Sequence, residues 1–337
     1  MKHSNVRKIA KLANLSPATV SRYFNGYAYV STEAKSRIKQ AMLQLNQQEQ
    51  SPENDLNVLV CCLASKQAYE FYHDVIQEMW QMCASEHITV SYLSLRSDES
   101  MQAAGMIRKT YSHVDCIVCV GGSLSAQMLD QVCDTGIPVI LIDNYHPRAH
   151  TVSVDNQQGL ALAVHHLHQM GHRRIAFIGG NQGHASLARR FEGYIKAMVE
   201  LGLEPLYADY QGGNFFDEGI AMTNELLAKS KGFTALIAGG EMMTYGALNA
   251  LGAAGLKIPA DVSLIGFGLR DSENATPGSI SSISLMPGAV ALFVVELIRM
   301  IQKKVISYPV RTYLLPEISL RATCAPLQEE PGATLTD

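Results

Sequence analysis

The first 50 residues carry an excess of basic side chains. The basic residues there are Lys2, Arg7, Lys8, Lys11, Arg22, Lys35, Arg37 and Lys39, and the acidic ones are Glu33 and Glu49. Since the whole chain has a formal net charge of −4, a basic head precedes an acidic body. Clustered lysines and arginines neutralise nucleic-acid phosphates, so this asymmetry suggests that the head contacts DNA. Charge alone is equally compatible with a merely solvated surface.

Three other groups of residues are of types that bind metals or phosphates. Cys116 and Cys119 form a C-x-x-C inside an apolar segment typical of a buried strand, where residues three apart point to opposite faces. His165 and His168 have helical spacing but no evident third ligand. We therefore expect no metal and no cofactor. The glycine-rich run 179–183, between a strand and a helix, suits a phosphate cradle or a tight turn equally well.

Composition and length predict a globular chain with two or three folding units. The 337 residues are 47% hydrophobic and 17% charged. No apolar leader with a cleavage site follows Met1, and no later apolar run is long and uncharged enough to cross a membrane. The seven cysteines are odd in number and scattered, which fits a reducing compartment rather than a disulfide framework. We expect a cytoplasmic protein with no membrane partner.

The basic head is predicted to contain only helices. Residues 6–13 have one apolar face, and a third helix runs from residue 32 to about 45. Between them, Ser16 followed by Pro17 is typical of an N-cap and a first helical position. Asn14 tolerates the left-handed backbone of a sharp turn. The pattern predicts a helix-turn-helix.

The remaining chain alternates apolar strands with amphipathic helices. Strands are predicted at 56–63, 87–93, 114–120, 137–142, 151–154, 174–178, 206–209, 235–238 and 262–267, and helices at 69–85, 99–110, 123–134, 156–170, 186–201, 218–229 and 242–252. This alternation is typical of parallel sheets covered by helices, and its restart after residues 151–154 indicates two lobes in tandem. The predicted fold class is α/β, with an all-α helix-turn-helix head.

These patterns divide the chain into four predicted segments. They are a helix-turn-helix domain at 1–46, a polar linker at 47–56, a two-lobed domain at 57–327 and a disordered tail at 328–337.

A dense set of head residues at fixed spacing points to a known family. The residues are Ile9, Ala10, Ala13, Leu15, Ser16, Thr19, Val20, Ser21, Arg22, Asn25, Gly26, Val30, Ser31, Glu33, Arg37 and Ile38. They resemble the headpiece of the lactose-repressor/galactose-repressor (LacI/GalR) family. The resemblance implies a bacterial regulator that binds operator DNA. A small helical domain for protein contact is the alternative reading.

The resemblance also implies which head residues face DNA. Arg22 would make a bidentate contact to guanine, whereas Pro17 and Ala18 offer only apolar contact, for example to a thymine methyl. Phosphate contacts are expected from hydroxyl and amide side chains, which are Ser16, Thr19, Ser21 and Asn25.

The segment after the head departs from the family. Members usually have a Tyr-x-Pro-Asn and Ala-Arg-x-Leu stretch, which forms a hinge helix and wedges a leucine into the minor groove. Residues 46–55 lack both the Arg and the Leu and carry Glu49, Glu53 and Asp55, which phosphates repel. We therefore expect no leucine wedge and a flexible or differently built connection.

The body continues the resemblance in matching order. The residues concerned are Ala163, Leu167, Gly171, His172, Ile175, Gly179, Arg190, Gly193, Tyr194, Gly246, Leu248, Ile258, Asp261, Ser263, Ile265 and Phe267. The family's core resembles type I periplasmic binding proteins, so the likeness implies two lobes with an effector in the cleft between them.

Only some of the family's effector-binding positions have matching residues in this chain. Asp143 and Arg190 match positions that hydrogen-bond a polyol in the family. Where the family has Asn-Asp and Asp-Asp pairs, this chain has Gly240-Glu241 and Gly268-Leu269, so a neutral hexose would lose several hydrogen bonds. Further candidates for the cleft wall are Ser65, Phe71, Tyr72, Ser186, Glu241 and Tyr245.

The sequence thus predicts a homodimeric, sequence-specific regulator, in this family usually a repressor, that binds double-stranded operator DNA. A sugar or related metabolite would modulate its operator affinity. One alternative keeps DNA binding but replaces the small effector with a protein partner, as the altered cleft suggests. A more distant alternative is a solute-binding receptor. No enzyme is expected, because no nucleophile–base pair, Walker loop or metal triad occurs at usable spacing.

Overall fold

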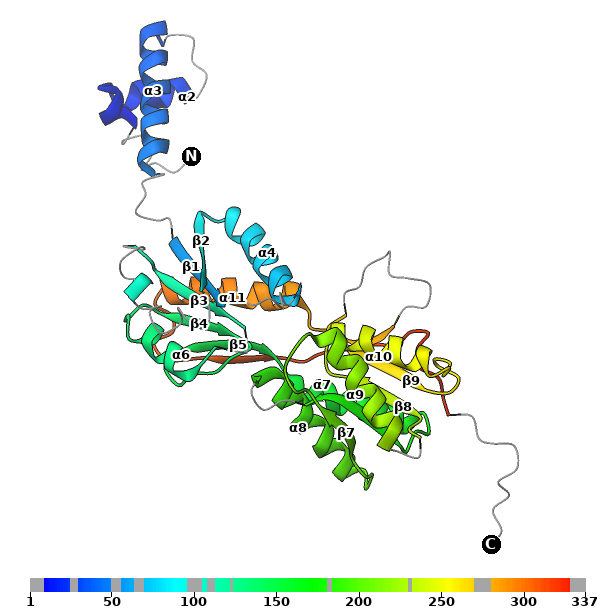
Figure 1. Cartoon of the computed structure of the whole chain (residues 1–337). Coiled ribbons are helices and arrows are strands. Elements are labelled where there is room, and N and C mark those ends of the chain that lie inside the picture. Colours follow the sequence, from blue (N-terminus) through cyan, green and yellow to red (C-terminus); the bar gives the residue numbers. More distant parts are fainter. Residues whose placement is uncertain are drawn as a thin grey trace. The chain divides into compact units, whose positions relative to one another are not determined.

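The chain folds as two compact units, Met1–Leu56 and Asn57–Asp337 (Figure 1). The computed structural model describes residues 9–24, 30–49, 56–63, 70–95, 105–107, 113–121, 124–180, 184–229, 232–269 and 280–327. The predicted tail at 328–337, most of the predicted helix at 99–110 and residues 50–55 of the predicted linker lie outside these ranges.

The first unit is helical around a small apolar core. Residues 9–13 are helical, and α2 (Pro17–Phe24) and α3 (Thr32–Glu49) follow. The buried residues are Ile9, Ala10, Ala13, Val20, Val30, Ile38 and Ala41. The prediction that the third helix ends near residue 45 is wrong by about one turn, because the Gln and Glu residues taken for a linker are also good helix formers.

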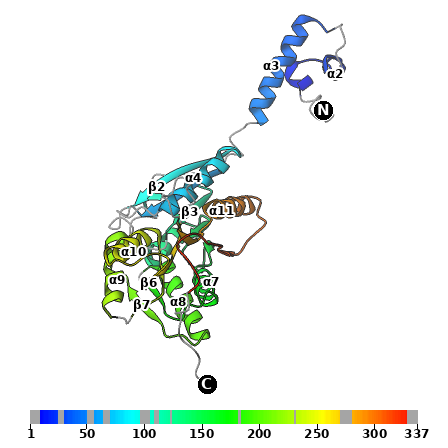
Figure 2. The same ribbon diagram turned by 90° about the vertical axis from the view of Figure 1, so that its right-hand side faces the viewer.

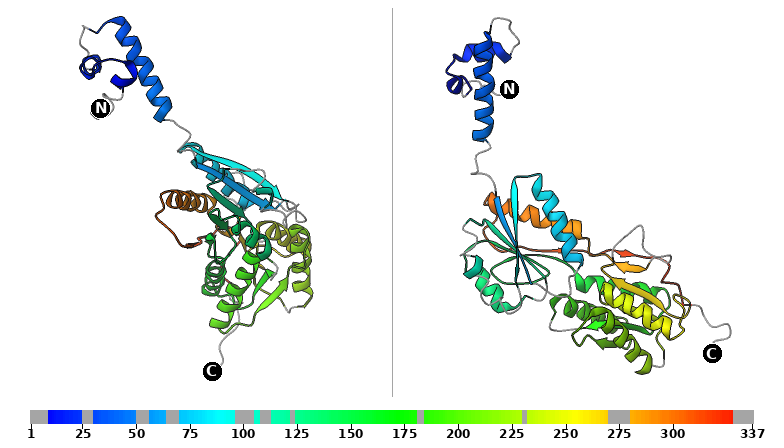
Figure 3. Two further views of the ribbon diagram at one scale, coloured as in Figure 1. Left: turned by 90° about the vertical axis from the view of Figure 1, so that its left-hand side faces the viewer. Right: turned by 45° about the horizontal axis from the view of Figure 1, so that its top comes forward.

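The second unit has two lobes, each built on a six-stranded sheet. In the first lobe the strand order is β11-β5-β4-β3-β1-β2. The strands are β1 (Leu56–Leu63), β2 (Ile88–Leu95), β3 (Cys116–Val120), β4 (Val139–Ile142), β5 (His150–Val154) and β11 (Arg311–Leu314). Alternate residues such as Ile117, Cys119 and Leu141 pack with α6 (Ala126–Cys133). Helices α4 (Glu70–Ala84) and α11 (Pro287–Gln302) lie side by side on this lobe (Figure 3).

The second lobe repeats this architecture with the order β12-β10-β9-β8-β6-β7. Its strands are β6 (Ile175–Gly180), β7 (Leu206–Asp209), β8 (Ala235–Ala238), β9 (Ser263–Phe267), β10 (Ser281–Ile283) and β12 (Ile318–Ser319). Its helices are α7 (Asn156–Gln169), α8 (Ala185–Glu200), α9 (Phe215–Lys229) and α10 (Glu241–Ala253), which surround the sheet in Figure 2. All pairings are parallel except β10 with β12.

The two lobes are interleaved along the chain, so the prediction of two tandem lobes is wrong in this respect. After β10 the chain returns to the first lobe for α11 and β11, and it then crosses back for β12. Strands of three, four and two residues are too short to show a period, which explains why the predicted alternation stops at Phe267. The α/β fold class and the all-α head are confirmed.

A close helix contact positions the cleft side of the second lobe. Helices α7 and α8 pack against each other at Gly193, where a Cβ atom would collide with the backbone carbonyl of Gln157. Because Gly193 has no side chain, α8 approaches the first turn of α7. The approach brings Arg190, one turn earlier on α8, within hydrogen-bond distance of Asn156.

Candidate functional site

The turn before α2 is fixed by local hydrogen bonds in the head. Asn14 adopts a left-handed backbone with φ of 52°, as predicted, and Ser16 caps α2 because its Oγ accepts from the Thr19 amide at 3.1 Å. The Ser16 and Thr19 hydroxyls are also 2.8 Å apart. This bonding presents the first turn of α2 in one fixed conformation.

The predicted DNA-facing residues gather on α2 and its cap. Ser16, Pro17, Ala18 and Arg22 are exposed, and Thr19 and Ser21 are partly buried. Val20, on the opposite side of the helix, is fully buried in the core. Asn25 lies outside the described residues. The exposed face of α2 therefore carries one cation, two small apolar side chains and several hydroxyls.

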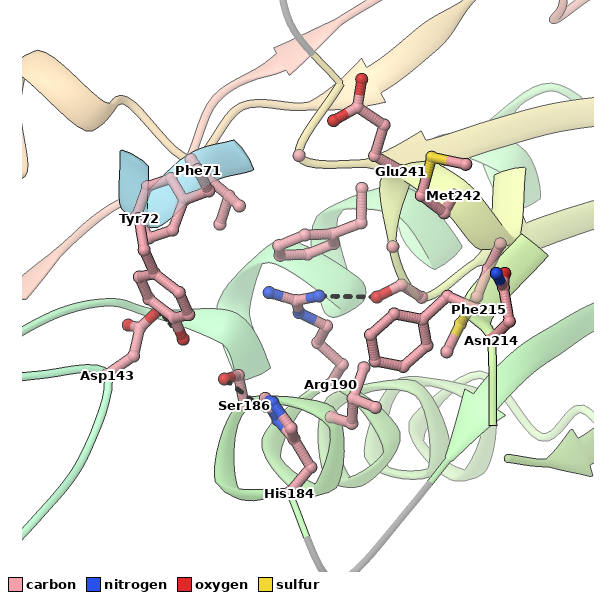
Figure 4. Close-up of a pocket in the computed structure, with 17 residues that line it drawn as sticks. Phe71, Tyr72, Asp143, His184, Ser186, Arg190, Asn214, Phe215, Glu241 and Met242 are labelled. Atoms are coloured by element: carbon pink, nitrogen blue, oxygen red, sulfur yellow. Dashed lines mark hydrogen bonds between the residues drawn. The ribbon is translucent and has the colours of Figure 1, made fainter. Parts of the chain in front are cut away.

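A cavity of about 340 Å³ lies between the two lobes of the second unit. The first lobe contributes Phe71, Tyr72 and Asp143, and the second contributes α8 and the residues around the ends of β8 and β9. Its lining residues are Phe71, Tyr72, Asp143, His184, Ser186, Leu187, Arg190, Asn214, Phe215, Gly239, Gly240, Glu241, Met242, Met243, Phe267, Gly268 and Leu285 (Figure 4). Hence six predicted effector residues meet here.

Arg190 is a fixed part of the cavity wall. It is 8% exposed, its Nε donates to Asn156 Oδ1 at 2.7 Å, and one terminal nitrogen donates to the Gly239 carbonyl at 2.6 Å. The guanidinium carbon lies 3.9 Å from the centroid of the Phe267 ring. Arg190 thus links the start of α7, the end of β8 and the end of β9 in one network.

Asp143 is a buried acceptor facing the cavity. It is 6% exposed and has a left-handed backbone with φ of 55°. Its Oδ2 accepts from the Tyr72 hydroxyl at 3.3 Å, while its Oδ1 has no hydrogen-bond partner among the described residues. Burial raises the pKa of Asp143 to about 6, against the opposing effects of the Arg190 charge, the Tyr72 hydroxyl, the Val154 backbone and the Ser153 hydroxyl. A ligand donor would satisfy this oxygen.

His184 is a cavity residue that the sequence analysis missed. It precedes α8, and burial, assisted by the nearby Arg190 charge, lowers its pKa to about 4. The imidazole is therefore neutral at physiological pH, and its Nδ1 lies 3.5 Å from the Ser186 hydroxyl. Arg190 is consequently the cation of the cavity wall.

Two cavity aromatics, Phe215 and Phe267, were also missed. Phe267 was recognised only as the end of a strand, and α9 starts three residues before its predicted beginning, so Phe215 fell outside it. Tyr245, predicted as a wall residue, does not line the cavity and is 37% exposed. Ser65 lies outside the described residues.

A second cavity, of about 290 Å³, shares Asp143 and Ser186 with the first. Its lining is mostly hydroxyl, amide and charged side chains. The residues are Asp143, Asn144, Tyr145, Thr151, Ser153, Val154, Asp155, Asn156, Gln157, Ala185, Ser186, Arg189 and Tyr313. It therefore borders the crossing from β5 to α7.

The other candidate groups occupy structural positions. Cys116 and Cys119 are fully buried in β3, and His165 bonds the Ala161 carbonyl through Nδ1 at 2.6 Å. Among the described residues, no group of three or more His, Cys, Asp or Glu side chains is arranged to hold a metal ion. Residues 181–183 of the glycine-rich run are outside the described ranges. No described helix is long and apolar enough to span a membrane.

Comparisons with known proteins match both units. Residues 5–48 match the family "Bacterial regulatory proteins, lacI family", and residues 164–324 match the "Periplasmic binding protein-like domain". The HTH-type transcriptional repressor PurR of Pasteurella multocida is 25% identical over 273 residues, covering 78% of this chain and 81% of that protein. PurR of Edwardsiella ictaluri is 26% identical over 284 residues, covering 81% and 83%.

Solved structures have the same fold. A lac repressor dimer bound to operator and the anti-inducer ONPF superposes with a TM-score of 0.72 at 19% identity, covering 94% of this chain and 98% of that one. A complex of the transcriptional regulator CelR with cellobiose gives 0.66 at 24% identity, covering 95% and 99%.

A helix-turn-helix joined to a two-lobed core with a cleft is typical of DNA-binding transcription regulators. The head carries the helix-turn-helix domain of the lacI family of bacterial regulatory proteins, and the core carries a periplasmic binding protein-like domain.

Proposed function

We propose that this regulator is a homodimeric repressor whose operator affinity is modulated by a small molecule bound between its lobes. The observation that carries the proposal is Asp143 Oδ1, a buried acceptor without a partner among the described residues, on the wall of an interlobe cavity. An unsatisfied buried oxygen costs about 1–3 kcal/mol, which a ligand donor would recover. A small molecule can fill the cavity and donate to this oxygen, so the small effector is the favoured reading.

In the head, α2 would be the recognition helix. Arg22 would read a guanine, while Pro17 and Ala18 would contact apolar base edges such as a thymine methyl. The hydroxyls of Ser16, Thr19 and Ser21, together with the Asn25 amide, would contact phosphates. Two heads related by a two-fold axis would bind the two halves of a pseudo-palindrome.

The relatives support a regulatory role without catalysis. The two named PurR proteins are repressors, and the CelR and lac repressor structures hold a small molecule. We assign DNA binding to residues 1–46, a linker to the part of 47–56 that lies between α3 and β1, effector binding and dimerisation to 57–327 and a tail to 328–337. A regulator of bacterial DNA would act in the cytoplasm.

The test is fluorescence-polarisation binding of the full chain to duplexes from the DNA flanking its own gene, at physiological salt. A shuffled duplex of equal composition is the control, and Arg22→Ala is the matched protein control. Sugars, sugar phosphates and nucleosides are then added singly. We expect selective, salt-sensitive binding that one compound alters.

Two results would contradict parts of this proposal. Equal affinity for native and shuffled duplexes across the flanking DNA and a genomic fragment library would remove sequence-specific regulation. Selective binding that no small compound alters, but that a cell extract depleted of small molecules does alter, would replace the effector with a protein partner.

A further inference from the structure

The larger cavity combines a broad apolar wall with a few polar groups. Rings and thioethers form much of that wall, among them Phe71, Tyr72, Phe215, Phe267 and Met242. In Figure 4 Tyr72 and Phe215 lie on opposite sides of the Arg190 guanidinium, one from each lobe. Aromatic walls suit a flat unsaturated ring, which gains offset and edge contacts with them.

The adjoining cavity has the opposite character. Ser153, Gln157 and Tyr313 contribute a hydroxyl, an amide and a phenol to its lining, and Arg189 contributes a half-exposed guanidinium. These groups match the alternating donors and acceptors of a polyol. The two cavities meet at Asp143 and Ser186, which line both.

Asp143 favours a hydrogen-bond donor on the ligand at the place where the two cavities meet. Its unpartnered Oδ1 requires a donor, and no second cation besides Arg190 lines the larger cavity among the described residues, whereas Glu241 adds another carboxylate there. A ligand that brings a hydroxyl to this point is favoured over one that brings a phosphate, because two carboxylates would repel the anion.

We infer that the effector is an amphipathic conjugate, a flat unsaturated ring joined to a polyhydroxylated group. This inference rests on the proposed function and specifies its ligand class. The ring occupies the aromatic cavity, the polyol extends into the polar cavity, and a hydroxyl near the junction donates to Asp143 Oδ1. Nucleosides and aryl glycosides share this chemistry, and a comparison of the two kinds of compound distinguishes them.

The experiment is calorimetric titration of the full chain, without DNA, with two matched sets of probes. One set is four nucleosides with their free bases and ribose. The other is the 4-nitrophenyl β-glycosides of four sugars with 4-nitrophenol and the free sugars. We expect one conjugate to bind at least tenfold more tightly than its ring alone and its polyol alone.

Two variants locate the two halves of the ligand. Phe215→Ala should weaken the conjugate and the free ring by the same factor, about tenfold or more. Gln157→Ala should weaken the conjugate severalfold and leave the free ring unchanged. Val199→Ala, a 65% exposed position on α8, is the matched control, and circular dichroism checks that every variant is folded.

Three outcomes overturn the inference. They are binding of a free sugar as tight as that of its conjugate, binding of a free ring as tight as that of its conjugate, and no binding by any of the eight conjugates. A free sugar that binds and alters DNA affinity would leave the proposed function intact, whereas loss of selective DNA binding would not affect the calorimetry.

Discussion

The head and the interlobe cleft use their polar side chains in opposite ways. On the head, Arg22 is exposed and no described residue holds it by a hydrogen bond or ion pair. In the cleft, Arg190 is buried and bonded to Asn156 and the Gly239 carbonyl, above the Phe267 ring. The head therefore offers separate contacts on a rigid helix, whereas the cleft offers a connected network.

Because of this difference, we expect ligand binding and stability to be independent in the head and coupled in the cleft. An exposed side chain can be removed without leaving buried groups unpaired, so its loss should affect only the ligand that it contacts. Removing a member of a buried network strands its partners, so stability and ligand binding should fall together.

The largest effect is expected for Arg190→Ala. The substitution leaves Asn156 and the Gly239 carbonyl without their donor and Asp143 without its neighbouring cation, so the core should lose about 2–5 kcal/mol of unfolding free energy. Urea denaturation followed by circular dichroism measures the loss. The adjacent Arg189, half exposed and 3.6 Å from Glu192, is the control, and Arg189→Ala should cost less than about 0.5 kcal/mol. Equal losses of unfolding free energy in Arg190→Ala and Arg189→Ala would contradict the difference between buried and exposed polar side chains.

The next effect is a pH dependence from Asp143. Its folded pKa of about 6 exceeds its ordinary value of 3.8, so the native state holds the proton between these values. Binding of this proton adds on the order of 3 kcal/mol to the free energy of unfolding. The whole contribution is present below pH 4, and it is lost as the pH rises through 6. Wild type should therefore lose stability relative to Asp143→Asn over that range.

His184 makes the comparison with Asp143→Asn necessary. Its folded pKa of about 4 lies below its ordinary value of 6.5, so its stability contribution is present above pH 6.5 and lost as the pH falls through 4. Over the same range the two groups act in opposite directions, and the wild-type curve alone would conceal both. If the difference in unfolding free energy between wild type and Asp143→Asn stayed constant from pH 4 to 7, the raised pKa of Asp143 would be refuted.

The same contrast explains what the sequence could predict. In the head, one contiguous stretch contains the cap, the turn and the exposed face, so Asn14, Ser16 and the buried Val20 follow from local rules. In the cleft, Asp143 and Arg190 were reached through the family resemblance, 47 positions apart in the numbering. Phe215, Phe267 and His184 carry no sign of their role, because an aromatic residue beside a strand or helix end is typical of ordinary core.

The interleaving of the lobes was beyond sequence reasoning for a related reason. Strands β11 and β12 pair with strands farther back along the chain, β5 for β11 and β10 for β12. Such short segments lack a period of their own, and tertiary pairing decides their structure. Helix α11 does begin with a local signal, since Pro287 occupies its first turn, but its position on the first lobe depends on α4.

A smaller effect, confined to DNA binding, is expected for Arg22→Ala. If Arg22 reads a guanine, specific affinity should fall by about 1–3 kcal/mol, and selectivity at one base pair should relax. Arg37→Ala is the control, because Arg37 is exposed on the same unit and paired with Glu33 at 3.0 Å. Polarisation binding to single-substituted operators measures both, and thermal unfolding should be unchanged. A uniform loss over all sequences would make Arg22 a phosphate contact instead.

The smallest effect tests whether stability and DNA binding are independent of each other in the head. Ser16 both caps α2 and is assigned to phosphate. Ser16→Ala should cost the head about 1 kcal/mol of stability through the lost cap, whereas Ser16→Gly, which solvates the helix end, should cost only a few tenths. Both variants lack the hydroxyl. If they lose DNA affinity equally while differing in stability, the hydroxyl acts on phosphate. If affinity follows stability, Ser16 acts only by holding α2 in place, and the head then resembles the cleft in coupling binding to its own structure.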